Sequence, residues 1–234
     1  MPGDRLIKVF LNPLQFEEID EPWASHLKHD VSLEAVMDFM CTPGIGSDLE
    51  SIITRYRKIS IEKRRLFAAP LEPRILDKLV WPLRHAKSSY MCGNYLGTIA
   101  LCGMVAEMVA MLLFEISNFA PNNRPMSGKD QESLFGRKFE KLGQERRVQI
   151  LSFFGIINDD LKQAFNIIRK TRSRYLHLWS QDHDQLPSNA EKCFDAAVLI
   201  VVTGIGQKIE EGKLVLTPAL VTYLEQHGGI AEQD

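Results

Sequence analysis

Residues 98–114 read TIALCGMVAEMVAMLLF, a nearly unbroken apolar run with a single carboxylate, Glu107, near its middle. The run is almost long enough to cross a bilayer, but a charge at the centre of a membrane costs about 2.5–3.5 kcal/mol on insertion scales. Its immediate flanks carry no basic residue that would set an orientation in a membrane. We therefore expect a buried central helix, and no membrane partner.

The whole chain has the composition of an ordinary globular protein. Its 234 residues are 45% hydrophobic and 25% charged, enough for one large domain or for a compact domain with an extension. The formal charge of −2 gives no global basic field, so any RNA contact has to come from local patches. No signal-peptide stretch opens the sequence, which predicts a cytoplasmic protein. We expect neither a metal nor a cofactor, because the cysteines are widely separated and have no neighbouring histidines: Cys41, Cys92, Cys102 and Cys193.

Short motifs mark where other helices begin. Residues 47–50 (SDLE) and 188–191 (SNAE) both match the capping box, in which a serine and a glutamate satisfy the first amides of a helix. Residues 217–218 (TP) predict an N-cap and a first-turn proline for a short last helix. Residues 120–131 are polar and turn-forming and indicate an exposed loop. Residues 6–11 give the only weak strand signal.

Two longer stretches predict pairs of helices. Residues 73–119 indicate a helical hairpin or a kinked pair, with Pro82 disturbing the first helix and Gly93 breaking the chain before the second. Residues 144–180 indicate a second pair, whose later helix has Asn158 as its N-cap. Convincing alternation of apolar and polar residues is scarce, so the sequence predicts an all-α protein.

One charge lies in an unexpected place on the helix that follows Asn158. Turning about 100° per residue, Arg172 falls in the middle of the apolar stripe. A buried arginine needs a partner, and Glu107 is a lone carboxylate in an apolar helix, so we expect the two to face each other across the bundle. A purely structural ion pair is one interpretation of them. The stripe itself consists of Leu161, Phe165, Ile168, Tyr175, Leu176 and Trp179.

The same helix carries further polar side chains near its end. Ser173 and His177 are four residues apart and share a face, so the hydroxyl can orient the imidazole. Arg172 and His177 are five apart, roughly 140° around the axis. Cooperation between them would need the long arginine side chain, a distorted helix end or a second subunit. A lone histidine near a helix end is more often a solvated or capping residue.

These residues resemble a known family. Residues 166–177 (NIIRKTRSRYLH) are similar to the signature of the HEPN (higher eukaryotes and prokaryotes nucleotide-binding) domain, an arginine followed by a polar residue and a histidine. Residues 86–107 resemble the first helical hairpin of bacterial HEPN-like proteins, in which one glutamate recurs. The resemblance covers about 71–212 and implies a HEPN-like helical bundle. Residues 1–70 would then be an N-terminal helical extension, and 213–234 a short C-terminal helix and tail.

The family resemblance also implies a function. HEPN proteins commonly dimerise, and many are metal-independent endoribonucleases of toxin–antitoxin, antiphage-defence or RNA-processing systems. By this resemblance Arg172 and His177 are catalytic, Glu107 holds Arg172, and Ser173 stands where asparagine is commoner. Serine keeps a hydrogen-bonding group but loses the two donors of the amide. The resemblance places RNA contacts on Arg169, Arg174 and Tyr175, although Tyr175 also fits the core.

The residue types suit this chemistry. RNA can be cleaved by its own 2′-OH, so the protein needs to move protons and stabilise a charged phosphorane. The ordinary pKa of a histidine, about 6.5, suits His177 to proton transfer. Arg172 is a permanent cation whose planar fork matches phosphate oxygens.

Three hypotheses follow from the sequence. The first is a homodimeric HEPN-type endoribonuclease with a defence, toxin or stress role. The second is a noncatalytic HEPN-like module that binds a nucleotide, RNA or a partner protein such as an antitoxin. The third is a helical structural protein in which Arg172 and Glu107 form only an ion pair. A basic cluster at residues 55–58 and 63–65 could also follow an RNA backbone, though charge runs are more often a solvated face.

Overall fold

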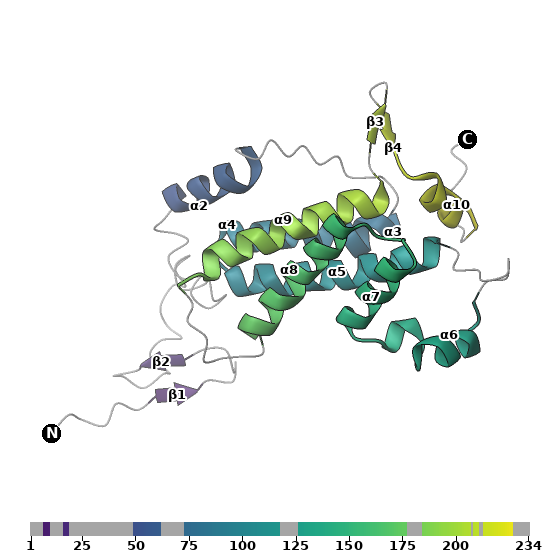
Figure 1. Cartoon of the computed structure of the whole chain (residues 1–234). Coiled ribbons are helices and arrows are strands. Elements are labelled where there is room, and N and C mark those ends of the chain that lie inside the picture. The colour runs from purple at the N-terminus through teal and green to yellow at the C-terminus, as the bar shows by residue number, and fades with distance from the viewer. Residues whose placement is uncertain are drawn as a thin grey trace.

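A computed structural model describes residues 7–9, 16–18, 49–61, 73–117, 126–176, 184–206, 208–210 and 213–226. Within these residues helices predominate and pack as a bundle (Figure 1), which confirms the all-α expectation. Two small antiparallel ribbons of three-residue strands accompany them, β1 (Ile7–Val9) with β2 (Phe16–Glu18) and β3 (Lys208–Glu210) with β4 (Lys213–Val215). The first strand falls in the weak strand signal of the sequence.

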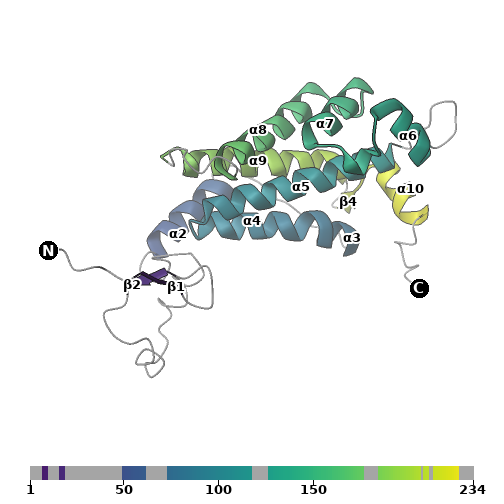
Figure 2. The ribbon, with the colours of Figure 1, turned by 90° about the horizontal axis from the view of Figure 1, so that it is seen from below.

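The centre of the bundle is α5 (Tyr95–Ile116), which forms from the apolar run. It begins at Asn94, whose side chain accepts a hydrogen bond from the Gly97 amide at 2.9 Å. Figures 1 and 2 show α5 alongside three long helices: α4 (Trp81–Met91), α8 (Asp159–Leu176) and α9 (Leu186–Ile205). By length and composition α5 could cross a membrane, and half of its most apolar window is buried inside the bundle.

The predicted pair of helices at residues 73–119 is confirmed. A short helix, α3 (Pro73–Ile75), continues into a π-helical turn, η3 (Leu76–Val80), and then into α4. Pro82 lies in the first turn of α4, directly after the π-helical turn, so the helix is irregular where the sequence predicted a disturbance. Gly93 has a φ of +79°, a left-handed conformation that glycine adopts without strain, and it turns the chain from α4 into α5.

The second predicted pair is also confirmed. It consists of α7 (Gln144–Phe153) and α8. Asn158 caps α8, because its Oδ1 accepts a hydrogen bond from the Leu161 amide at 2.9 Å. The fold between α7 and α8 therefore follows the sequence signal closely.

The predicted exposed loop at 120–131 is wrong over its second half. Residues 118–125 lie outside the described part of the chain, but α6 (Gly128–Phe135) begins inside the predicted loop. Ser127 caps it: the Ser127 side chain accepts from the Asp130 amide, and Asp130 accepts from the Ser127 amide. The sequence signal for this helix was Ser127 followed three residues later by Asp130, an aspartate in place of the commoner glutamate or glutamine of a capping box.

The helix starts near the C-terminus are partly corrected. The capping box at 188–191 is wrong: Ser188 would place the first helical residue at Asn189, but α9 begins three residues earlier, at Leu186, and has Pro187 in its first turn. The predicted last helix is confirmed as α10 (Pro218–Gln226). Thr217 precedes it, but within the described residues its buried hydroxyl has no hydrogen-bond partner and does not cap the helix.

An N-terminal helix, α2 (Leu49–Tyr56), continues into a second π-helical segment, η2 (Arg57–Ile61), and both pack against the bundle. Arg55 donates from Nε to the Met91 carbonyl at 2.7 Å, at the end of α4. Lys58 forms an ion pair of 2.7 Å with Glu191 on α9, and Ile59 is buried. Part of the basic cluster therefore attaches α2 to the bundle. Residues 47 and 63–65 lie outside the described residues.

Candidate functional site

The candidate site is formed where α8 crosses α5. Arg172 on α8 donates from Nη1 to Oε1 of Glu107 on α5 at 2.6 Å, so the prediction that these two charges face each other is confirmed. The helical wheel had placed Arg172 in the core, but the pair lies nearer to the surface. The Arg172 side chain is 26% exposed and the Glu107 side chain is 44% exposed. The stem of an arginine can run along an apolar surface while its charged head reaches solvent, which explains the difference in depth.

The apolar stripe of α8 is otherwise where it was predicted. Leu161, Phe165, Ile168 and Tyr175 are all buried. The side chain of Leu176 and the whole of Trp179 lie outside the described residues. The side chain of Arg172 therefore extends from a well-packed helix face towards solvent.

Gly103 makes room for this arginine. It lies one helical turn before Glu107 on α5, and a Cβ at this position would overlap the Cδ, Nε and Cζ atoms of Arg172. The arginine stem therefore lies directly across the backbone of α5, with Nε buried. Gly103 was missed in the sequence, where the signal was a glycine four residues before the lone glutamate, on the same face of the helix.

The guanidinium of Arg172 keeps unused donors. A guanidinium carries several N–H donors in a planar fork. Within the described part of the chain, the bond to Glu107 is its one hydrogen bond, and Nε has no partner there. Because the side chain is partly exposed, the free N–H groups can reach an anion that approaches from solvent.

Arg169 lies one turn before Arg172 on α8 and reaches the other neighbouring helix. Its Nη1 lies 3.2 Å from Oε2 of Glu145 on α7, and its Nε is also buried with no partner among the described residues. The two arginines thus connect α8 to α7 on one side and to α5 on the other. Each cationic head is paired with one carboxylate, so the two arginines are held in fixed places at this edge of the bundle.

The remaining predicted site residues are divided between surface and core. Ser173 and Arg174 are exposed on the last turns of α8. Tyr175 is buried, and its hydroxyl accepts a hydrogen bond from Nδ2 of Asn189 on α9 at 2.8 Å. A ring in this position is a core residue and has no open face for a base. His177 lies outside the described residues, directly after the last residue of α8, so its role stays a prediction.

The described residues offer no arrangement for a metal ion: no group of three or more histidine, cysteine, aspartate or glutamate side chains comes together in them. Two of the cysteines, Cys102 on α5 and Cys193 on α9, are free and fully buried against each other. The hydrogen bond between them and their burial raise the pKa of the Cys102 thiol well above its usual value. The Cys102 thiol is therefore protonated and behaves as a small apolar side chain.

Comparison of the chain with protein-family models, curated proteins and solved structures finds no match. The HEPN resemblance therefore depends on the residues quoted from the sequence alone. Of those residues, the structure brings Glu107 and Arg172 together and adds Gly103 beneath them.

Proposed function

We propose that this chain is a HEPN-type, metal-independent endoribonuclease that acts as a cytoplasmic homodimer in a defence, toxin or stress response. The observation that carries the proposal is the Arg172 guanidinium, which Glu107 holds over Gly103 at the edge of the bundle with N–H donors to spare. Such a fixed and partly exposed cation is suited to a phosphate group.

In the proposed reaction the RNA supplies its own nucleophile. The 2′-oxygen attacks the adjacent phosphorus and loses its proton, the bond to the 5′-oxygen breaks, and the 5′-oxygen takes up a proton. The products are a 2′,3′-cyclic phosphate and a 5′-hydroxyl. Arg172 stabilises the additional negative charge on the phosphorane, and His177 transfers a proton. Ser173, four residues before His177, orients the imidazole.

The proposed dimer draws support from the outer face of α5. Leu96, Ala100 and Met104 are exposed along this face, and Glu107 follows them one turn later. An apolar helix face in solvent is unfavourable, and a second copy of the chain would bury it. A twofold axis there brings two copies of Arg172 into one groove, where the two His177 side chains can complete the site.

The second candidate is a noncatalytic module of the same family that binds RNA, a nucleotide or an antitoxin. It is favoured by Ser173, because serine lacks the two amide donors of the commoner asparagine. In this alternative Arg169 and Arg172 still bind phosphate groups, but no bond is broken.

The test is to incubate the purified protein with mixed RNA in EDTA. We expect cleavage to 2′,3′-cyclic phosphate ends by the wild type, and a loss of about 100-fold or more in Arg172→Ala and in His177→Ala. Lys170→Ala is the matched control, because Lys170 is an exposed cation on the far side of α8. This variant should cleave RNA at the wild-type rate. Equal cleavage by all four proteins would contradict these roles.

Binding distinguishes the two candidates. If the wild type binds RNA without cleaving it and Arg172→Ala loses the binding, the noncatalytic module is the correct interpretation. If neither cleavage nor binding depends on Arg172, the pair with Glu107 is structural.

A further inference from the structure

Two exposed aromatic rings on one side of the bundle each carry a cation on their face. Trp81 begins α4, and the Cζ atom of Arg84 lies 5.2 Å from the centre of its ring. Tyr56 ends α2, and Nζ of Lys87 lies 5.3 Å from the centre of its ring. Both distances are within the range of a cation–π contact. Neither the proposed RNA cleavage nor the proposed dimer uses these residues.

The two pairs form one row along α4. Three residues turn a helix by about 300°, so each step of three residues moves the row about 60° around the helix axis. The row therefore winds towards α2, which is attached to the end of α4 by Arg55. Its part on α4 is about 9 Å long, at about 1.5 Å per residue. This cation–aromatic row consists of Trp81, Arg84, Lys87 and Tyr56.

The two cations of the row lie close together and have no carboxylate partner. Neither Arg84 nor Lys87 forms an ion pair with any described residue. The pKa of Lys87 is lowered by its burial and by repulsion from Arg84. An anion bound between the two side chains would relieve this repulsion.

The surroundings of the row are also basic. Together α2, η2 and α4 contain five lysines and arginines and a single carboxylate, Glu50, although the chain as a whole has a charge of −2. Asp77 is exposed about one turn before Trp81 and limits the row at that end. Glu191 of α9 is held by Lys58 at 2.7 Å. A polyanion is therefore favoured along the row itself.

The rings add a second kind of contact. Trp81 is 43% exposed and Tyr56 is 41% exposed. Nucleic-acid bases stack on aromatic rings and on the plane of a guanidinium. Alternating rings and cations are typical of sites for single-stranded nucleic acid, where cations follow the phosphates and rings hold the bases. A duplex keeps its bases paired and cannot stack them on such a surface.

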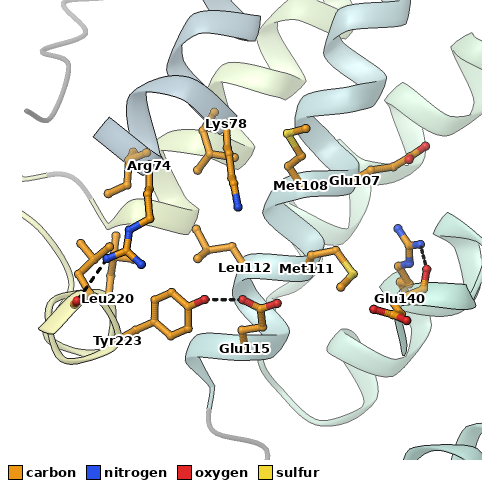
Figure 3. Close-up of a pocket in the computed structure, with 14 residues that line it drawn as sticks. Arg74, Lys78, Glu107, Met108, Met111, Leu112, Glu115, Glu140, Leu220 and Tyr223 are labelled. Atoms are coloured by element: carbon orange, nitrogen blue, oxygen red, sulfur yellow. Dashed lines mark hydrogen bonds between the residues drawn. The ribbon is translucent and has the colours of Figure 1, made fainter. Parts of the chain in front are cut away.

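The row is separate from the Arg172 site. Figure 2 shows α4 and α8 on opposite sides of α5 and α9. A cavity of about 460 Å³ lies between η3, α5 and α10 (Figure 3), and Glu107 is part of its lining, so this cavity adjoins the Arg172 site. Lys78 projects into the cavity, whereas no member of the row lines it.

We propose that the cation–aromatic row binds a single strand of RNA, with phosphate groups on Arg84 and Lys87 and bases stacked on Trp81 and Tyr56. That the strand is RNA rests on the proposed ribonuclease function, whereas the binding of a single strand rests on the row alone. In a ribonuclease this surface raises the affinity for long strands and takes no part in breaking the bond.

The test measures the fluorescence anisotropy of a labelled 2′-O-methyl oligouridine during titration with the full-length protein. A length of about 12 nucleotides is within the usual site sizes for single strands. The methylated 2′-oxygen cannot attack the phosphorus, so binding is measured whether or not the protein cleaves RNA. We expect saturable binding, and binding at least tenfold weaker for a 2′-O-methyl duplex of the same length. Tryptophan fluorescence should also be quenched by the single strand, and this quenching should be lost in Trp81→Phe.

Variants then test each part of the row. Arg84→Gln combined with Lys87→Gln should weaken binding at least tenfold. It should also reduce the slope of log affinity against log salt by about 1.4, since each phosphate contact on a single strand contributes about 0.7. The matched control is Lys129→Gln combined with Lys138→Gln, which removes two exposed cations on and beside α6 and should leave affinity and slope unchanged. Trp81→Ala should weaken binding at least tenfold, with circular dichroism confirming that the variant is folded.

Three results would each overturn the proposal. They are unchanged affinity in the double variant of α4, equal binding of the single strand and the duplex, and binding of phosphatidylserine–phosphatidylcholine vesicles by a protein that does not bind the oligonucleotide. The two proposals fail in different ways. A protein that binds the oligonucleotide through the row but does not cleave RNA contradicts the proposed function alone, and one that cleaves RNA but binds independently of the row contradicts this proposal alone.

Discussion

The two faces of α5 that meet α9 and α8 are built differently, although each contains a close approach to a glycine. On the α9 face, Val109 packs against Gly204, where an added Cβ would lie 2.7 Å from the valine Cγ1. The neighbours there are fully buried and apolar, including Cys102 and Cys193. On the α8 face, Gly103 is crossed by Arg172, which ends on Glu107 at the solvent edge.

The two faces of α5 differ in what they contribute: buried apolar side chains stabilise the bundle, whereas an ion pair near solvent mainly positions a charge. Burying a large apolar side chain contributes about 1.5–3 kcal/mol, whereas an ion pair near solvent contributes about 0–1 kcal/mol. The α9 face therefore holds the bundle together. The pair of Arg172 and Glu107 adds little stability, but it fixes one cation in a defined place, and that placement is the basis of the proposed site.

The largest expected effect is on the α9 face. Ile200 of α9 is fully buried, so Ile200→Ala should reduce the free energy of unfolding by about 2–5 kcal/mol. Its neighbour Leu199 is exposed, and Leu199→Ala should change it by about 0.5 kcal/mol or less. Urea denaturation of both variants measures the contrast. Similar losses in the two would mean that α9 packs with a different face.

A smaller net effect is expected from Gly103→Ala on the α8 face. The new methyl group displaces the Arg172 stem at a cost of about 1–3 kcal/mol, and the better helix propensity of alanine returns about 1 kcal/mol. Stability should therefore fall by no more than about 2 kcal/mol, while the Nε–H resonance of Arg172 moves. An unchanged arginine resonance would show that the stem does not lie over Gly103.

A double-mutant cycle with Glu107→Gln and Arg172→Met should give a coupling energy of about 0.2–1 kcal/mol. The coupling should decrease with added salt, because both side chains are partly exposed. Urea denaturation at low and high salt measures it. A coupling above about 3 kcal/mol, insensitive to salt, would instead indicate a buried pair.

The smallest effect concerns Tyr223, which contacts α5 from a third side. Because its pKa is raised from 10.0 to about 12, its contribution to stability is complete below pH 10 and is lost as the pH rises towards 12. Tyr223→Phe should therefore lose less stability than the wild type between pH 10 and pH 12, as followed by thermal unfolding. Parallel losses in the two proteins would argue that the hydrogen bond to Glu115 does not form.

Local signals in the sequence were sufficient for much of the fold. The apolar run gave α5, and the Asn158 cap gave the start of α8. The pairing of Glu107 with Arg172 could be predicted because each charge lay alone among apolar neighbours and needed the other. Each of these inferences used spacing along one helix or the cost of an unpaired charge.

The errors and omissions also have physical causes. The start of α9 was misplaced because Ser188 matched a capping box, whereas Pro187 is favoured in a first turn and places the start earlier. The depth of Arg172 was overestimated because a helical wheel follows Cα directions and ignores the length of the side chain. The role of Gly103 and the cavity beside α10 both depend on contacts between helices that are distant in sequence. The periodicity of apolar residues along one helix does not report such contacts.

The most direct test of the account is the rate of RNA cleavage in EDTA by Gly103→Ala beside the wild type. This variant leaves Arg172, His177 and Glu107 chemically intact and moves only the guanidinium. If the guanidinium held over Gly103 is the catalytic cation, the wild type cleaves, and Gly103→Ala, still folded, cleaves at least tenfold more slowly. Equal rates in the two proteins, or no cleavage by the wild type, would contradict it.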